Sequence, residues 1–188
     1  AVVRAAGAGD GPAGGGGGTL VPLAELAARM AEARDRGQMV LVLSGGCGDV
    51  ETYFSYDMSV LVDCKALLGE VFVHKRKTQE QAQAELRAKV TEAMDSRGFC
   101  KPLHLRMANT AFDWSSFCCA DFPPELFSGS RWTVEEAFRR GFIDRSQRSQ
   151  LELDPARFGG FQTVVTSDFD AQGAERFLAD KLPYYGDL

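Results

Sequence analysis

The stretch from Val40 to Thr52, VLVLSGGCGDVET, has the outline of a strand that leads into a phosphate-binding loop. Such a loop reads G-x-x-x-x-G-K-[ST]: its glycines let backbone N–H groups face the phosphates, its lysine reaches them, and its hydroxyl holds magnesium. In the register that begins at Gly45, the positions that could serve such a site are Gly45, Gly46, Gly48 and Thr52. Val50 stands at the second required glycine and Glu51 at the lysine. Because a carboxylate repels phosphate, we interpret the stretch as a turn that needs glycine for its geometry.

A nucleotide-hydrolysing site has two further requirements. The loop is followed by a helix, and we expect Thr52–Ser59 to be too short to form all of it. A carboxylate pair at a strand end holds magnesium and orients water. Asp63 follows the apolar run SVLV and could bind magnesium, but Cys64 stands where the second carboxylate is needed. We therefore favour Asp63 as a cap at the carboxyl edge of a sheet and Asn109 as a turn residue. We expect no catalytic residue, cofactor or metal.

The histidines do not indicate a catalytic centre. The run Thr166–Asp168 could form a catalytic trio with His104, but the chain has no G-x-S-x-G pattern around a nucleophile. His104 lies in a predicted strand, where we expect a hydrogen-bonded core histidine. His74 belongs to the basic run HKRK, which is more typical of a solvated loop than of a phosphate or acidic-partner site.

The cysteine pattern argues against a disulfide framework and for a reducing compartment, because the number is odd and no C-x-x-C pair occurs. The five are Cys47, Cys64, Cys100, Cys118 and Cys119. The adjacent pair Cys118–Cys119 could bind a metal or undergo redox chemistry, but we expect buried free thiols.

Length and charge set broader limits. A chain of 188 residues is long enough for one domain with a full core. A net charge of −5 argues against a nucleic-acid partner, which requires a clustered basic face. No apolar run approaches the roughly 20 residues that span a bilayer, so we expect no transmembrane segment.

The chain is predicted to consist of a flexible Gly/Ala-rich segment, residues 1–19, and a single α/β domain, residues 20–188. The first segment is interpreted either as a linker within a longer protein or, from its Val-Arg-Ala-Ala start, as the end left by removal of an organellar transit peptide.

Apolar and β-branched runs predict four strands in the domain, at Met39–Leu43, Ser59–Val62, Cys100–Met107 and Phe161–Ser167. Apolar spacing and capping residues predict helices from Pro22 to Gly37, from Thr78 to Gly98, from Thr133 to Gly141, and from Asp168 or Asp170 to Pro183. The polar segment Asp144–Arg157 is predicted to be a loop, with a possible short strand at Leu151–Leu153. The alternation predicts a three-layer αβα sandwich with a mostly parallel sheet of about four to five strands.

Aromatic residues crowd an insert around residues 112–157 and exceed what a surface loop needs. Some must pack on the sheet, and the remainder could be exposed as an anchor for a protein partner. The candidates for partner binding are Phe112, Trp114, Phe122, Phe127 and Trp132.

The order of these features resembles the degenerate AAA-type P-loop modules of dynein heavy chains, and similar nucleotide-free modules in axonemal proteins with IQ and ankyrin segments. The stretches that carry the resemblance span Met39 to Pro183: MVLVLSGGCGDVETYF, AMDSRGFCKPLHLRMANTAFD, FQTVVTSDF and AQGAERFLADKLP. The insert Phe112–Arg157 has no counterpart in that pattern. The resemblance implies an αβα fold whose ATPase activity is lost, and a location in the ciliary axoneme.

These observations lead to the hypothesis of a non-catalytic structural or interaction subunit of a larger protein assembly, with other subunits as partners. One alternative is an atypical nucleotide-binding enzyme. Another is a small-molecule α/β enzyme that uses the strand ends near Asp63, Asn109 and Asp168. The expected location is the ciliary axoneme or, if the start is a processed end, a chloroplast or mitochondrion.

Overall fold

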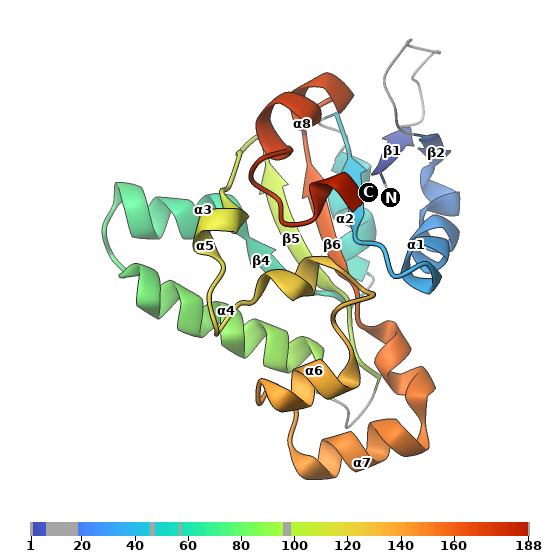
Figure 1. Ribbon diagram of the computed structural model, residues 1–188. Coiled ribbons are helices and arrows are strands. Elements are labelled where there is room, and N and C mark those ends of the chain that lie inside the picture. Colours follow the sequence, from blue (N-terminus) through green and yellow to red (C-terminus); the bar gives the residue numbers. More distant parts are fainter. Residues whose placement is uncertain (1, 7–18, 46–47, 57, 96–98, 188) are drawn as a thin grey trace.

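The protein is described by a computed structural model that places residues 2–6, 19–45, 48–56, 58–95 and 99–187 (Figure 1). The strands within these residues are β1 (Val2–Ala6), β2 (Thr19–Pro22), β3 (Val40–Leu43), β4 (Val60–Asp63), β5 (Leu103–Ala108) and β6 (Thr163–Ser167). The α-helices are α1 (Leu26–Asp35), α2 (Gly48–Tyr56), α3 (Cys64–Leu68), α4 (Gln79–Ala93), α5 (Trp114–Phe117), α6 (Val134–Arg139), α7 (Arg145–Leu153) and α8 (Ala171–Leu178). Shorter helical turns are η1 (Leu23–Glu25), η2 (Gly69–Val73, a π-helix), η3 (Pro124–Phe127), η4 (Pro155–Gly160) and η5 (Tyr185–Asp187). Of the helices described, none is long and apolar enough to cross a membrane.

The strands form one sheet in the order β2-β1-β3-β6-β5-β4, and every neighbouring pair is parallel. The last strand in the chain, β6, therefore lies between β3 and β5. All residues of β3 and β6 are buried, as expected for parallel strands covered on both faces. The four predicted strands are confirmed as β3, β4, β5 and β6.

The N-terminal part of the chain extends this sheet. Strand β1 pairs with β2 on one side and with β3 on the other, and the side chains of Val3 and Val21 are buried. The prediction of a flexible segment over residues 1–19 is therefore wrong for residues 2–6 and for Thr19, whereas residues 7–18 lie outside the described residues. The glycine-rich composition of residues 1–19 led to the prediction of a flexible segment, but residues 2–6 form β1, which contains two valines and is stabilised by pairing with β3.

Helices cover both faces of the sheet, which confirms the three-layer αβα sandwich. On one face, α1 and α2 pack on β3 and β6; this core contains Leu26, Met30, Val42, Phe54 and Val164. On the other face, α3, α4, α8 and the segment between β5 and β6 form a larger core. This face carries the green, yellow and orange helices of Figure 1.

Local signals define the helix ends where a cap is present. The Thr78 side chain accepts a hydrogen bond from Gln81 N, and Thr78 N donates to the Gln81 side chain, which confirms the capping box at the start of α4. Asp170 caps α8 through Gly173 N. Gly37, with φ of +67°, follows α1 and provides the left-handed turn that ends it.

The segment Asp144–Arg157 differs from its prediction. It forms α7, not a loop with a short strand, and it begins with a reciprocal capping box between Asp144 and Gln147. Leu151 is the one buried residue of this helix. Because α7 buries so little apolar surface, its sequence lacks the apolar stripe by which a helix is recognised.

The aromatic insert is part of the core. Phe112, Trp114, Phe122, Phe127 and Trp132 are each at most 2% exposed. The Trp114 ring lies 4.4 Å from the ring of Phe112 and 5.0 Å from that of Phe122, measured between centroids. These side chains present no surface to a partner, and their prediction as a partner-binding anchor is corrected. They cover a face of the sheet that the other helices leave open.

A core role predicts that Phe122→Ala lowers the free energy of unfolding by about 3–5 kcal/mol, because it removes a buried ring and leaves a cavity. Phe72→Ala is the matched control, since Phe72 is 55% exposed and its truncation costs less than about 0.5 kcal/mol. Urea unfolding of both variants measures the difference. Equal stabilities would show that the Phe122 ring is not an essential part of the core.

Candidate functional site

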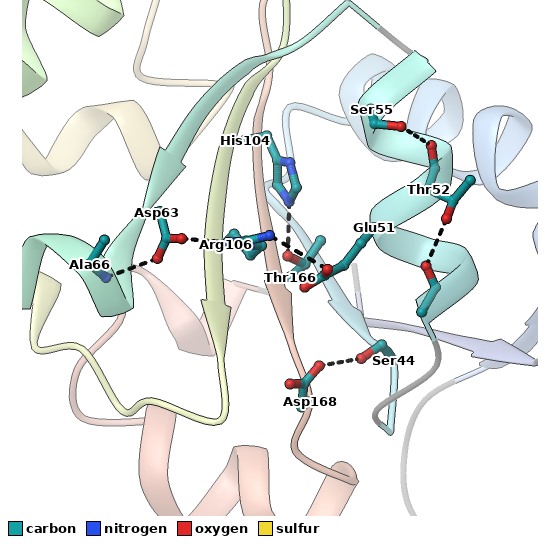
Figure 2. A network of polar contacts seen from close by, with 11 residues as sticks. Ser44, Glu51, Thr52, Ser55, Asp63, Ala66, His104, Arg106, Thr166 and Asp168 are labelled. Carbon is teal, nitrogen blue, oxygen red and sulfur yellow. Dashed lines mark hydrogen bonds and ion pairs between the residues drawn. The ribbon is translucent and has the colours of Figure 1, made fainter.

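The carboxyl ends of the parallel strands lie at one edge of the sheet, where α/β proteins commonly bind ligands. The sequence-derived candidates for a nucleotide or small-molecule site that the structure describes gather here. The loop after β3 carries Gly45, Asp63 ends β4, and Asp168 follows β6. Figure 2 shows the polar contacts between these ends and α2.

The loop after β3 is held against the end of β6. Ser44 is buried, and its hydroxyl donates to Asp168 Oδ1 at 2.8 Å; Ser44 N donates to the Ser167 carbonyl at 2.8 Å. Gly45 follows with φ of +58°, a conformation that favours glycine. Gly46 and Cys47 lie outside the described residues.

Helix α2 begins directly at Gly48 and extends over nine residues. The prediction that Thr52–Ser59 is too short to form all of the helix after the loop is confirmed, because the helix begins at Gly48, before Thr52. The Thr52 hydroxyl is exposed and donates to the Gly48 carbonyl within α2 at 3.1 Å. The first turn of α2 carries Asp49 and Glu51, so acidic side chains occupy the helix end that attracts anions.

Arg106, in β5, links two carboxylates from different elements. Its Nη1 lies 3.5 Å from Glu51 Oε2, and its Nη2 donates to Asp63 Oδ2. The other Asp63 oxygen accepts from Ala66 N at 2.9 Å and so caps α3. The prediction that Asp63 is a cap at the carboxyl edge is confirmed. Glu51, which stands at the position of the phosphate-binding lysine, is paired with the guanidinium of Arg106.

The bridge formed by Arg106 with Glu51 and Asp63 shifts the pKa values of Asp63 and Arg106. Partial burial alone would raise the pKa of Asp63, but the N–H of Ala66 and the guanidinium of Arg106 together lower it below its ordinary value. The hydrogen bond that Arg106 donates to Asp63 raises the pKa of Arg106. Both groups are therefore held in their charged forms.

His104 is a core residue. Its Nε2 lies 2.8 Å from the Thr166 hydroxyl, its ring packs at 4.3 Å from the ring of Phe54, and it is 3% exposed. Burial lowers the pKa of His104 to about 4, with a further contribution from the charge of Arg106. Asp168 binds Ser44 instead, so these residues do not form a catalytic trio. The expectation of a hydrogen-bonded core histidine is confirmed.

The basic run HKRK is a surface segment, as predicted. Lys77 forms ion pairs with Glu70 at 2.6 Å and with Glu85 at 2.8 Å, and His74 is exposed. Asn109 lies in the exposed turn after β5, next to Ala108, whose φ is +50°.

The cysteines described by the structure are free thiols: Cys64 and Cys100 are buried, and Cys118 and Cys119 are partly buried. Burial raises the pKa of Cys118 to about 12, which keeps the thiol protonated. Within the described residues, no group of three or more His, Cys, Asp and Glu is arranged to hold a metal ion.

Sequence reasoning missed Arg106 and Ser44, which organise this edge. Their chain neighbours contain no pattern that marks them. The signal lies in the strand register, in which Arg106 is opposite Asp63 of β4 and Thr166 of β6. It becomes visible only when the strand order is known.

An open hollow lies beside this bridge, at the ends of β4 and β5. Its volume is about 820 Å³, and it extends over α3 and η2.

Comparison with protein-family models, with curated proteins and with solved structures finds no match for the chain.

Burial of neutral His104 predicts a pH-dependent loss of stability. Below pH 6.5 the unfolded chain takes up a proton that folded His104 does not accept until about pH 4, so stability is full above 6.5 and falls as the pH decreases through this window. We expect this group to lower the free energy of unfolding by about 2 kcal/mol between pH 7 and pH 5.

His104→Gln serves as the comparison, because glutamine can still bond to Thr166 but does not titrate. Urea unfolding of both proteins at pH 7 and pH 5 isolates the histidine, since the carboxylates are common to both. If both lose equal stability, His104 is not the titrating group.

Proposed function

We propose that this chain is a non-catalytic structural or interaction subunit of a larger protein assembly, built on a degenerate nucleotide-binding-type fold. The resemblance to degenerate AAA-type modules motivates the second part of this proposal. The first part is supported by how the polar residues are used and by where the apolar surface lies.

The residue types that could do chemistry at the carboxyl edge are engaged in contacts that stabilise the fold. Asp63 caps α3 and pairs with Arg106, Asp168 holds Ser44, and His104 is bonded to Thr166 in the core. Glu51 stands where a phosphate-binding lysine is required. This arrangement supports a scaffold more than a site that activates a nucleophile or holds magnesium.

The observation that carries the proposal is the concentration of exposed apolar side chains around the edge strand β4. Eight large apolar residues are exposed in the described part of the chain, and five of them belong to residues 56–73. The five are Tyr56, Met58, Leu61, Phe72 and Val73. Surfaces that bind other proteins carry exposed apolar side chains, and this segment supplies most of those in the described residues.

The backbone of β4 adds to this surface. Val60 N donates to Pro102, just before β5, so the alternate residue Leu61 directs its N–H and C=O away from β5. β4 is the last strand on its side of the sheet, and in the described residues this edge has no partner strand. Unpaired strand edges provide backbone groups to which another chain can add.

The proposal predicts that nucleotides do not stabilise the protein. Millimolar ATP, GTP or ADP, with and without magnesium, should leave the melting temperature unchanged, because a ligand stabilises only a protein that binds it. Glu51→Lys should lose at most about 1 kcal/mol of stability through its half-exposed ion pair and should not gain nucleotide binding.

Glu80→Lys controls for the change in net charge, since Glu80 is an exposed residue of α4 away from the loop. A nucleotide-dependent rise in the melting temperature of Glu51→Lys alone would show that the loop geometry can bind phosphate. A rise in the wild type would refute the non-catalytic proposal in its present form.

The interaction surface is tested by tagged protein purified from cells that make it. We expect Leu61→Lys/Phe72→Lys to lose a discrete set of co-purifying proteins, because two charges disrupt an apolar contact at little cost to the fold. Leu153→Lys is the control, since Leu153 is 87% exposed at the end of α7. Quantitative mass spectrometry compares the proteins that co-purify with the wild type, with the double variant and with the control. The comparison is valid when the three have the same melting temperature. If all three retain the same proteins, the surface around β4 is not the binding surface.

A further inference from the structure

The hollow at the ends of β4 and β5 has the size and position of a ligand site. Its volume of about 820 Å³ lies within the range of roughly 300–1,000 Å³ found for small-molecule sites. It opens at the carboxyl ends of parallel strands, the edge at which such sheets bind ligands. Apolar side chains, including Ala66, Leu68 and Val73, line part of it beside charged residues.

The backbone at this hollow is irregular. The pairing of β5 with β6 shifts register between Arg106 and Ala108, and Ala108 has φ of +50°. A non-glycine residue in this conformation is costly and persists where the surrounding structure requires it. Bulges of this kind reorient side chains near binding sites, and here the bulge directly follows Arg106. Ala108 and Arg106 both line the hollow.

The acidic residues of the hollow differ in how firmly they are bound. Glu70 is paired with Lys77 at 2.6 Å, and Asp63 is held by both Arg106 and Ala66 N. Glu51 lies 3.5 Å from Arg106, and its side chain is 49% exposed. An ion pair of this length and exposure contributes little, so Glu51 can be displaced from Arg106 into water.

The basic residues of the hollow can receive an anion. Arginine carries five N–H donors in a planar fork that matches carboxylates and phosphates, and the described contacts of Arg106 use one donor on each Nη. Lys65 and His74 also line the hollow, and in the described residues neither forms an ion pair. Both are exposed and therefore accessible to a ligand.

We propose that this hollow binds a small molecule with a carboxylate or phosphate group, which takes the place of Glu51 on Arg106 and is also contacted by Lys65. The Glu51 carboxylate then acts as a built-in competitor that occupies Arg106 while the ligand is absent. The ligand is a small carboxylate or phosphate and not a nucleotide, because the lining also carries the carboxylates of Glu51, Asp63 and Glu70, which repel a polyphosphate. The proposal goes beyond the interaction function and does not depend on it, because the hollow requires no protein partner.

The test is a titration of ¹⁵N-labelled protein, at constant ionic strength, with inorganic phosphate in one arm and succinate in another, and with sodium chloride as the reference. We expect saturable shifts of the amides of Lys65, Arg106 and Ala108 with phosphate, with succinate or with both, and this pattern identifies the preferred group. Shifts that match those in chloride, or that arise elsewhere in the chain, would overturn the proposal.

Surface variants give the proposal a second, directional test. Glu51→Gln should bind the effective anion about two- to fivefold more tightly, because it removes a competitor whose ion pair is weak. Lys65→Ala should bind it several-fold more weakly, whereas Arg145→Ala, which removes an exposed charge on α7, should not change the affinity.

Arg106→Lys keeps a positive charge beside Asp63 but lacks the planar fork, and we expect about tenfold weaker binding. If this variant does not fold, Glu51→Gln and Lys65→Ala still decide the question, because both change exposed side chains. Unchanged affinity in Glu51→Gln would refute the competitor role, and unchanged affinity in Lys65→Ala would refute the assigned contact.

Discussion

The fold depends on the insertion of β6 between β3 and β5. All five residues of β6 are buried, and its pairing joins β2, β1 and β3 to β5 and β4 in one sheet. The same insertion brings Ser44 to Asp168 and His104 to Thr166, contacts between residues 124 and 62 positions apart. Because β6 is the last strand in the chain and lies between earlier strands, these contacts join residues that are far apart in the sequence. The polar edge is therefore a consequence of strand order.

The charged groups of this edge specify an arrangement more than they supply stability. Exposed ion pairs typically contribute less than about 1 kcal/mol, so most of the free energy of folding comes from the two apolar cores. Arg106 nevertheless links α2 to the β4–α3 junction, since it contacts one carboxylate from each. The firm contact with Asp63 and the loose contact with Glu51 give the bridge one fixed side and one side that can open.

The division between buried and exposed aromatic residues changes the functional interpretation of the chain. The insert between β5 and β6 uses its rings to cover the sheet, and Arg87 of α4 fastens it through Asp121 and the carbonyls of Arg140 and Gly141. Most of the exposed large apolar residues described lie instead in the segment 56–73, which contains the edge strand β4. A surplus of aromatic residues in a sequence thus indicates a core that needs extra cover as readily as it indicates an interface.

The sequence by itself determined the central strands, the capping box of α4, and the negative charge where a phosphate-binding lysine is required, because each depends on residues close together in the chain. For α8 it left Asp168 and Asp170 as alternatives, and the structure shows that Asp170 is the cap. Only the tertiary structure decided that β1 and β2 extend the sheet, that α7 is a helix, that the insert's rings are buried and that Arg106 joins Glu51 to Asp63. Those partners lie 55 and 43 positions from Arg106. Such contacts depend on strand order and burial, which local periodicity does not encode.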